Sequence, residues 1–136
     1  MRRLLPAYFA TLAAFCALDF AWLALVAGNW YSSQLGALLL PTPNWAAALP
    51  FYPLYVLGIV YFCVRPAAGV PARAAATGAL FGLCAYATYD LTNLATIAGW
   101  TPAVAIVDLT WGVVVTAVAA WVGARVAGRA GAGPRA

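Results

Sequence analysis

The stretch PAVAIVDLTWGVVVTAVAAWVGA, residues 102–124, holds one charged side chain, Asp108, in an otherwise apolar run. A helix of that length covers about 34 Å, which is enough to cross the ~30 Å hydrocarbon core of a bilayer. Three further apolar stretches of similar length run from about Leu4 to Val26, Ala46 to Val64 and Ala74 to Ile97. The sequence therefore predicts an all-α membrane protein with four transmembrane helices in a bundle.

Composition supports a membrane protein and excludes a soluble one. Hydrophobic residues make up 66% of the chain and charged residues 7%, whereas soluble domains have about 25% charged residues. We expect a single transmembrane domain over residues 1–127 and a disordered cytoplasmic tail over residues 128–136. A cleaved signal peptide is not expected, because the first apolar run is too long and carries Asp19 near its end.

The basic residues predict the orientation of the chain. All are Arg, and none falls in the first connection, about residues 28–45, or in the third, residues 98–101. The positive-inside rule then puts both termini and the second connection in the cytoplasm, as in a multi-pass protein of a bacterial inner membrane. The Arg are dispersed, so no nucleic-acid partner is expected. They are Arg2, Arg3, Arg65, Arg73, Arg125, Arg129 and Arg135.

The first connection is unusual, because residues 29–41 are partly apolar but too few to span a bilayer. We expect a short interfacial or re-entrant segment on the outer face. Asn44 is placed to cap the second span. An aromatic belt at the outer interface is expected from Trp30, Tyr31, Trp45 and Trp100.

The only acidic residues of the chain, Asp19, Asp90 and Asp108, all lie inside predicted spans. Each costs about 2.5–3.5 kcal/mol at the bilayer centre on insertion scales, so three are expected to be functional. Counted from the cytoplasmic ends of their segments, they lie 15 or 16 residues in, or about 22–24 Å. The topology therefore puts all three carboxyls at one level, in the outer third of the bilayer.

Polar and aromatic neighbours accompany these acids. Asp19 and Asp108 each have a Trp three residues later, and Asp90 has an Asn three residues later. Residues at this spacing share a helix face. Gly78 and Gly82 continue the face of Asp90, which predicts close helix packing there. Together these patterns predict a binding pocket of Asp19, Asp90, Asp108, Trp22, Trp111, Asn93, Tyr86, Tyr89, Tyr52 and Tyr55.

Several chemistries are excluded or not expected. The chain has no His, Lys or Glu, so haem sites, a retinal Schiff base, hydrolytic triads and a P-loop nucleotide site are excluded. The three cysteines, Cys16, Cys63 and Cys84, lack C-x-x-C spacing, so no metal site is expected. Three carboxyls close together in a low dielectric cannot all ionise easily, so at least one is expected to be neutral at pH 7 unless a cation is bound.

The sequence resembles a bacterial family of predicted membrane proteins known as domain of unknown function 2177. The resemblance runs from about Leu4 to Val126, and it is most specific at Tyr86-Ala-Thr-Tyr-Asp-Leu-Thr-Asn93. It implies a four-span inner-membrane protein and carries over no reaction and no catalytic residue. The chain also has the size of small multidrug resistance transporters, but it lacks their first-span Glu. Its one-sided charge predicts that any homo-oligomer is parallel.

Three functions remain open at this point. The first, which we favour, is binding or transport of a proton, a cation or a small cationic solute. The second is a lipid-modifying enzyme or accessory factor acting at headgroup depth, with Asp as general acid and base. The third is a structural membrane scaffold in which protonated Asp side chains hold helices together. The partners expected are therefore the bilayer and a cation or lipid ligand, and an enzymatic role is left open.

Overall fold

The computed structural model describes residues 3–130, and every regular element within them is helical. The all-helical fold expected from the sequence is therefore confirmed. In chain order the elements are α1 (Leu4–Ala21), a π-helical turn (Trp22–Ala27), α2 (Gly28–Leu35), a 3₁₀ turn (Gly36–Leu38), α3 (Trp45–Ile59), a second π-helical turn (Val60–Val64), α4 (Pro71–Thr96) and α5 (Pro102–Arg129).

Local chemistry explains where the later helices begin. The Asn44 side chain accepts a backbone N–H from the first turn of α3 at 3.4 Å, which confirms the predicted cap. Thr101 does the same for α5 at 3.2 Å. Pro71 and Pro102 occupy the starts of α4 and α5, where a missing N–H costs nothing and the fixed φ suits a helix.

Among the described residues, three helical segments are long and apolar enough to cross a membrane, namely Leu4–Leu38, Trp45–Val64 and Pro102–Arg129. α4, with 26 residues, has the length but is not among them. Its second half carries Tyr, Thr, Asp and Asn side chains, which lower its hydropathy. Three of the four expected spans are thus supported by length and composition, and the fourth stays a prediction.

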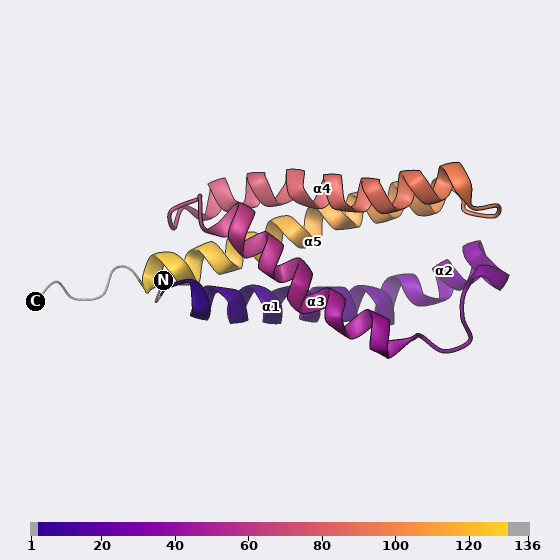
Figure 1. Cartoon of the computed structure of the whole chain (residues 1–136), viewed down its shortest axis with the longest axis horizontal. Helices are drawn as coiled ribbons and strands as arrows, with labels where there is room; N and C mark the ends of the chain where they lie inside the picture. Colours follow the sequence, from indigo (N-terminus) through magenta and orange to yellow (C-terminus); the bar gives the residue numbers. More distant parts are fainter. Residues whose placement is uncertain (1–2, 131–136) are drawn as a thin grey trace, which may run out of the picture.

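The segments that carry the Arg residues lie at one end of the molecule (Figure 1). The start of α1, the α3–α4 connection and the end of α5 lie at one end, and the α4–α5 connection lies at the other. We call the first the arginine end, because Arg3, Arg65, Arg73, Arg125 and Arg129 belong to these segments, and the second the distal end.

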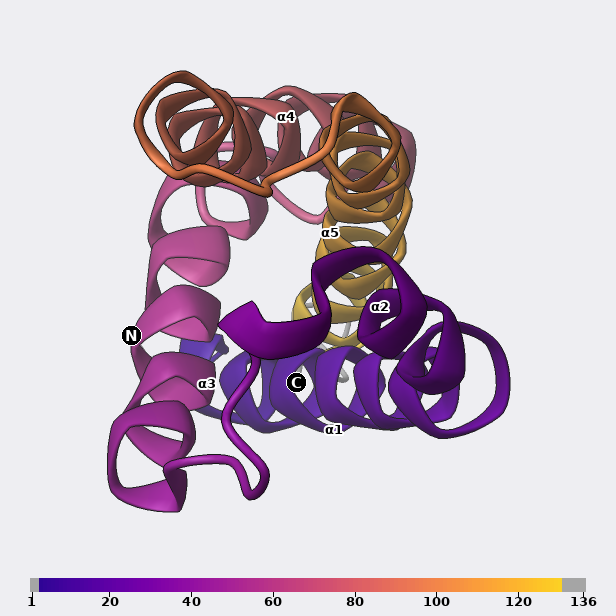
Figure 2. The ribbon, with the colours of Figure 1, turned by 90° about the vertical axis from the view of Figure 1, so that its right-hand side faces the viewer.

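Viewed end-on, α1, α3, α4 and α5 surround a common core, and α2 folds across the distal end toward α5 (Figure 2). α3 crosses α1 obliquely (Figure 1). The core takes fully buried side chains from each of these helices, including Phe15, Ile59, Ala74 and Val115. The helices therefore share one hydrophobic core.

Glycines let α4 and α5 approach closely along their length. A Cβ at Gly78 would lie 2.8 Å from the Cβ of Ala120. One at Gly82 would overlap the backbone carbonyl of Gly112, and one at Gly112 would overlap the ring of Tyr86. The close packing predicted from Gly78 and Gly82 is confirmed, and its partners lie on α5.

Two boundaries differ from those expected. The first helix does not stop near Val26 but continues without a break through α2 to Leu38. It holds no charge or Pro between these points. The α-helical part ends at Gly36, whose φ of 47° favours glycine, and the 3₁₀ turn continues to Leu38. α5 continues past Ala124 to Arg129, into the predicted tail. The rest of that tail, residues 131–136, lies outside the described residues, as does Arg2.

Candidate functional site

Asp19 of α1 is buried, with 9% of its surface exposed, and it accepts hydrogen bonds from two other helices. The Tyr52 hydroxyl of α3 donates to Oδ2 at 2.8 Å. The Trp111 indole Nε1 of α5 donates to Oδ1 at 3.2 Å. The side chains predicted from three separate segments therefore meet at one carboxyl.

Asp108 of α5 is partly buried and is held by the segment that extends the first helix. The Tyr31 hydroxyl of α2 donates to Asp108 Oδ1, and it accepts from the Trp22 indole Nε1 at 3.5 Å. Tyr31 was predicted only as part of an interfacial belt, and its contact with Asp108 was not predicted. α2 follows the π-helical turn Trp22–Ala27 and lies close to α5 in Figure 2. Tyr31, on α2, thereby reaches the Asp108 carboxyl.

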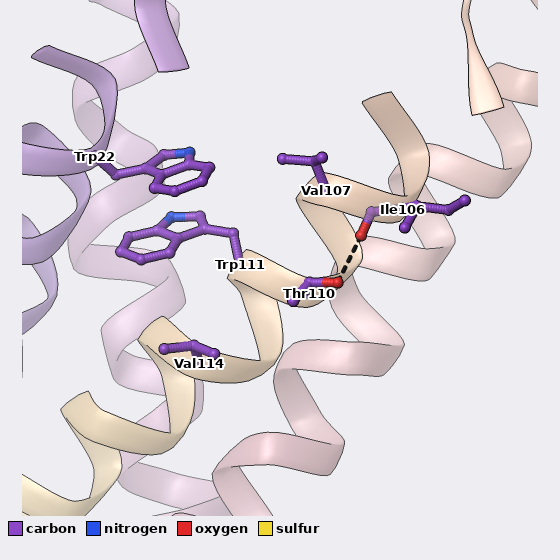
Figure 3. A pocket seen from close by; sticks show the side chains of 6 residues that line it. All are labelled: Trp22, Ile106, Val107, Thr110, Trp111 and Val114. Atoms are coloured by element: carbon purple, nitrogen blue, oxygen red, sulfur yellow. Dashed lines mark hydrogen bonds between the residues drawn. The ribbon is translucent and has the colours of Figure 1, made fainter. Parts of the chain in front are cut away.

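The rings of Trp22 and Trp111 join the two carboxyl sites. They stack with centroids 4.6 Å apart and planes 10° from parallel. Their nitrogen atoms lie on the same edge of the stack (Figure 3), and one donates to Asp19 while the other donates to Tyr31. We call the connected set the acid network. It consists of Asp19, Asp108, Trp22, Trp111, Tyr31 and Tyr52.

An apolar groove of about 330 Å³ opens beside the stacked indoles (Figure 3). The only hydroxyl on its wall belongs to Thr110, and this hydroxyl donates to the Ile106 carbonyl of its own helix at 2.7 Å. The groove therefore offers apolar surface for contact. We call it the α5 groove, and it is lined by Trp22, Ile106, Val107, Thr110, Trp111 and Val114.

Asp90 does not join the acid network. Its side chain is fully buried, and neither carboxyl oxygen has a hydrogen-bond partner. The Trp100 indole Nε1 is also buried without a partner, although we expected Trp100 in the interfacial belt. The structure thus links two of the three predicted carboxyls through hydrogen bonds and the Trp22–Trp111 stack, whereas Asp90 has no hydrogen bond to this set.

The other predicted site residues occupy different environments. Tyr55 pairs its hydroxyl with Thr116 Oγ1 at 2.9 Å, in the core. The Tyr86 ring lies against Gly112 and 6.4 Å from the ring of Tyr55, centroid to centroid.

Tyr89 is 55% exposed and packs edge-on against Trp100, so it points away from the acid network. Asn93 is half-buried near the end of α4, beyond the network's hydrogen bonds. Among Tyr55, Tyr86, Tyr89 and Asn93, Tyr86 fits the predicted pocket wall best, because it lies between α4 and α5 in the core.

The carboxyls of the acid network accept hydrogen bonds only from uncharged groups among the described residues. The donors are neutral hydroxyl and indole groups. The guanidinium groups of Arg65 and Arg125 lie over aromatic rings near the arginine end, 5.1 Å and 4.7 Å from the ring centroids. Within residues 3–130, no group of three or more Cys or Asp side chains has the geometry to hold a metal ion, and the three cysteines are free.

The fold and site define the chain as a helical membrane protein that buries acids within an apolar bundle. It belongs to the DUF2177 family of predicted membrane proteins, whose family model matches residues 4–125. This match confirms the resemblance noted in the sequence. No match was found among curated proteins or solved structures.

Proposed function

We propose that the protein binds a proton or a small cationic solute at the carboxyls of Asp19 and Asp108. One observation carries this proposal: two acids from different helices share one network whose donors are all neutral. Ionised carboxyls in a low dielectric need a counter-charge or a proton. The described Arg side chains belong to the arginine end and do not supply one.

Aromatic rings around the carboxyls support a cation as the ligand. The Trp22 and Trp111 stack and a second stack of Phe20 on Tyr52, 5.4 Å between centroids, border Asp19. Ring faces attract cations, most strongly where water is excluded. We infer that an organic ammonium ion would gain both a carboxylate partner and aromatic contact here.

The proposal includes a topology. α4 would be the fourth span, because it packs along α5 through Gly78 and Gly82 despite its lower hydropathy. The arginine end would face the cytoplasm of a bacterial inner membrane, and the acid network would then lie toward the outer face. Buried apolar residues such as Ala7, Val64 and Ala124 fill the bundle toward the arginine end. They favour binding from one side over an open pathway.

A structural role is the second candidate, and the hydrogen bonds themselves favour it. Asp19 and Asp108 link α1, α2, α3 and α5, as internal glue would. Interhelical hydrogen bonds of this kind contribute about 0.6 kcal/mol each in membranes, up to ~1.7. This gain is smaller than the insertion cost of about 2.5–3.5 kcal/mol per acid, which favours a ligand as the reason for the acids.

The two candidates differ in what Asp→Asn variants lose. In phosphatidylcholine nanodiscs, we expect saturable binding of ethylammonium or tetramethylammonium, accompanied by proton release if the site is protonated when empty. D19N and D108N should each weaken that binding about tenfold or more. D90N, outside the network, should leave it unchanged. Normal binding in D19N and D108N, or no binding by the wild type with no proton release, would refute the proposed function.

A further inference from the structure

We propose that the ligand of the acid network is a membrane amphiphile with a terminal ammonium group on an alkyl chain, and that its chain lies in the α5 groove. This inference rests on the proposed cation site and names its substrate class. It combines two features of the structure, the acid network and the α5 groove, which share the same pair of Trp side chains.

The shared wall is the stacked pair of Trp22 and Trp111. Their N–H groups donate into the acid network, and their rings line the groove (Figure 3). On α5, the groove residue Val107 directly precedes Asp108. Trp111, which lines the groove, follows Asp108 by three residues and so shares its side of α5. An ammonium group at Asp108 would therefore lie next to a wall of the groove.

The α5 groove runs along the helix axis, as an alkyl chain of a lipid would. From Ile106 to Val114 it follows α5 for eight residues, about 12 Å along the helix axis. Asp108 lies near the distal end of this stretch, so the groove extends from the carboxyl toward the arginine end. A lipid whose headgroup sits at the distal end would point its chain along this path.

The chemistry of the groove also selects a chain over a polar ligand. Ile106 and Val114 are largely exposed apolar side chains, and the Thr110 hydroxyl is already bonded to its own helix. A polar solute would find no free donor or acceptor there. Because lipid tails are as apolar as the groove, the chain gains packing rather than hydrophobic transfer, so the ammonium group must supply selectivity.

Two photoaffinity probes test this in phosphatidylcholine nanodiscs. Both carry a dodecyl chain with a diazirine, and they differ only in ending with an ammonium or a hydroxyl group, so they partition similarly through their chains. Labelled peptides are mapped by mass spectrometry. We expect the ammonium probe to label residues 106–114 at least about tenfold more than the hydroxyl probe, and ethylammonium to compete.

Variants separate the groove from the carboxyls. T110W fills the groove and D108N removes the charge, so each should abolish the preference for the ammonium probe. V118W, on an exposed part of α5 outside the groove, should preserve it, and circular dichroism checks that each variant is helical. Equal labelling by both probes, or labelling that T110W does not lower, would overturn the inference. If ethylammonium still binds in that case, the proposed function stands, and if it neither binds nor releases a proton, both fail.

Discussion

Replacing Gly82 with Ala should separate α4 from α5 and destabilise the bundle. A Cβ at Gly82 would lie 2.7 Å from Thr116 Oγ1 and 2.8 Å from Thr116 Cβ, and it would overlap the carbonyl oxygen of Gly112. Ordinary contacts begin at 3.4 Å, so the helices must move apart by at least about 0.6 Å. The obstacles are backbone and a short, buried side chain, which cannot rotate away.

The magnitude follows from two opposing effects. Overpacking a tightly packed interface costs about 1–3 kcal/mol, and contact with backbone places this site at the upper end. Ala is favoured over Gly within a helix by up to about 1 kcal/mol. The difference predicts that G82A lowers the free energy of unfolding by about 2 kcal/mol.

Unfolding in mixed micelles, titrated with sodium dodecyl sulfate and followed by circular dichroism, measures this change. G58A is the matched control, because a Cβ there would meet only the ring tip of Phe81, at 3.0 Å. That flexible side chain can move, so G58A should stay within about 0.5 kcal/mol of the wild type. If G82A is as stable as the wild type, or if both variants lose stability equally, the inferred contact between α4 and α5 is incorrect.

Two further predictions concern the acid network. Y52F removes one donor and should lower the free energy of unfolding by about 0.6 kcal/mol, up to ~1.7, in the same titration, while Y89F, at an exposed ring, should not. W22F should remove the near-ultraviolet circular dichroism couplet of its stack with Trp111, while W45F, at an exposed indole, should preserve it. A couplet that survives W22F would contradict the stacking.

Sequence alone predicted the helices well because apolar length and caps are local properties. The start of α3 followed from Asn44, and the close packing of α4 followed from Gly78 and Gly82. The role of Tyr31 was not accessible in this way. It meets Asp108 across 77 positions of sequence, and no motif in the sequence signals that contact.

The placement of Asp90 shows a second limit of sequence reasoning. Counting residues along a helix gives the height of a side chain, but its direction depends on how the helix is rotated against its neighbours. The α4–α5 contact at Gly82 and Gly112 fixes that rotation, and Asp90 is buried there without a hydrogen bond to the acid network. The equal heights predicted for the three Asp side chains therefore did not decide whether all three join one hydrogen-bonded network.

The separation of Asp90 also assigns the acids different roles. Asp90 and the Trp100 indole are both buried without partners, and a carboxyl and an N–H are complementary. A small adjustment that pairs them would fasten the α4–α5 connection over the distal end and offset the cost of leaving both groups unpaired. Asp19 and Asp108 already have neutral donors, yet these donors bring no charge. A structural explanation therefore suits Asp90, whereas for the two acids of the network we propose a proton or a cation.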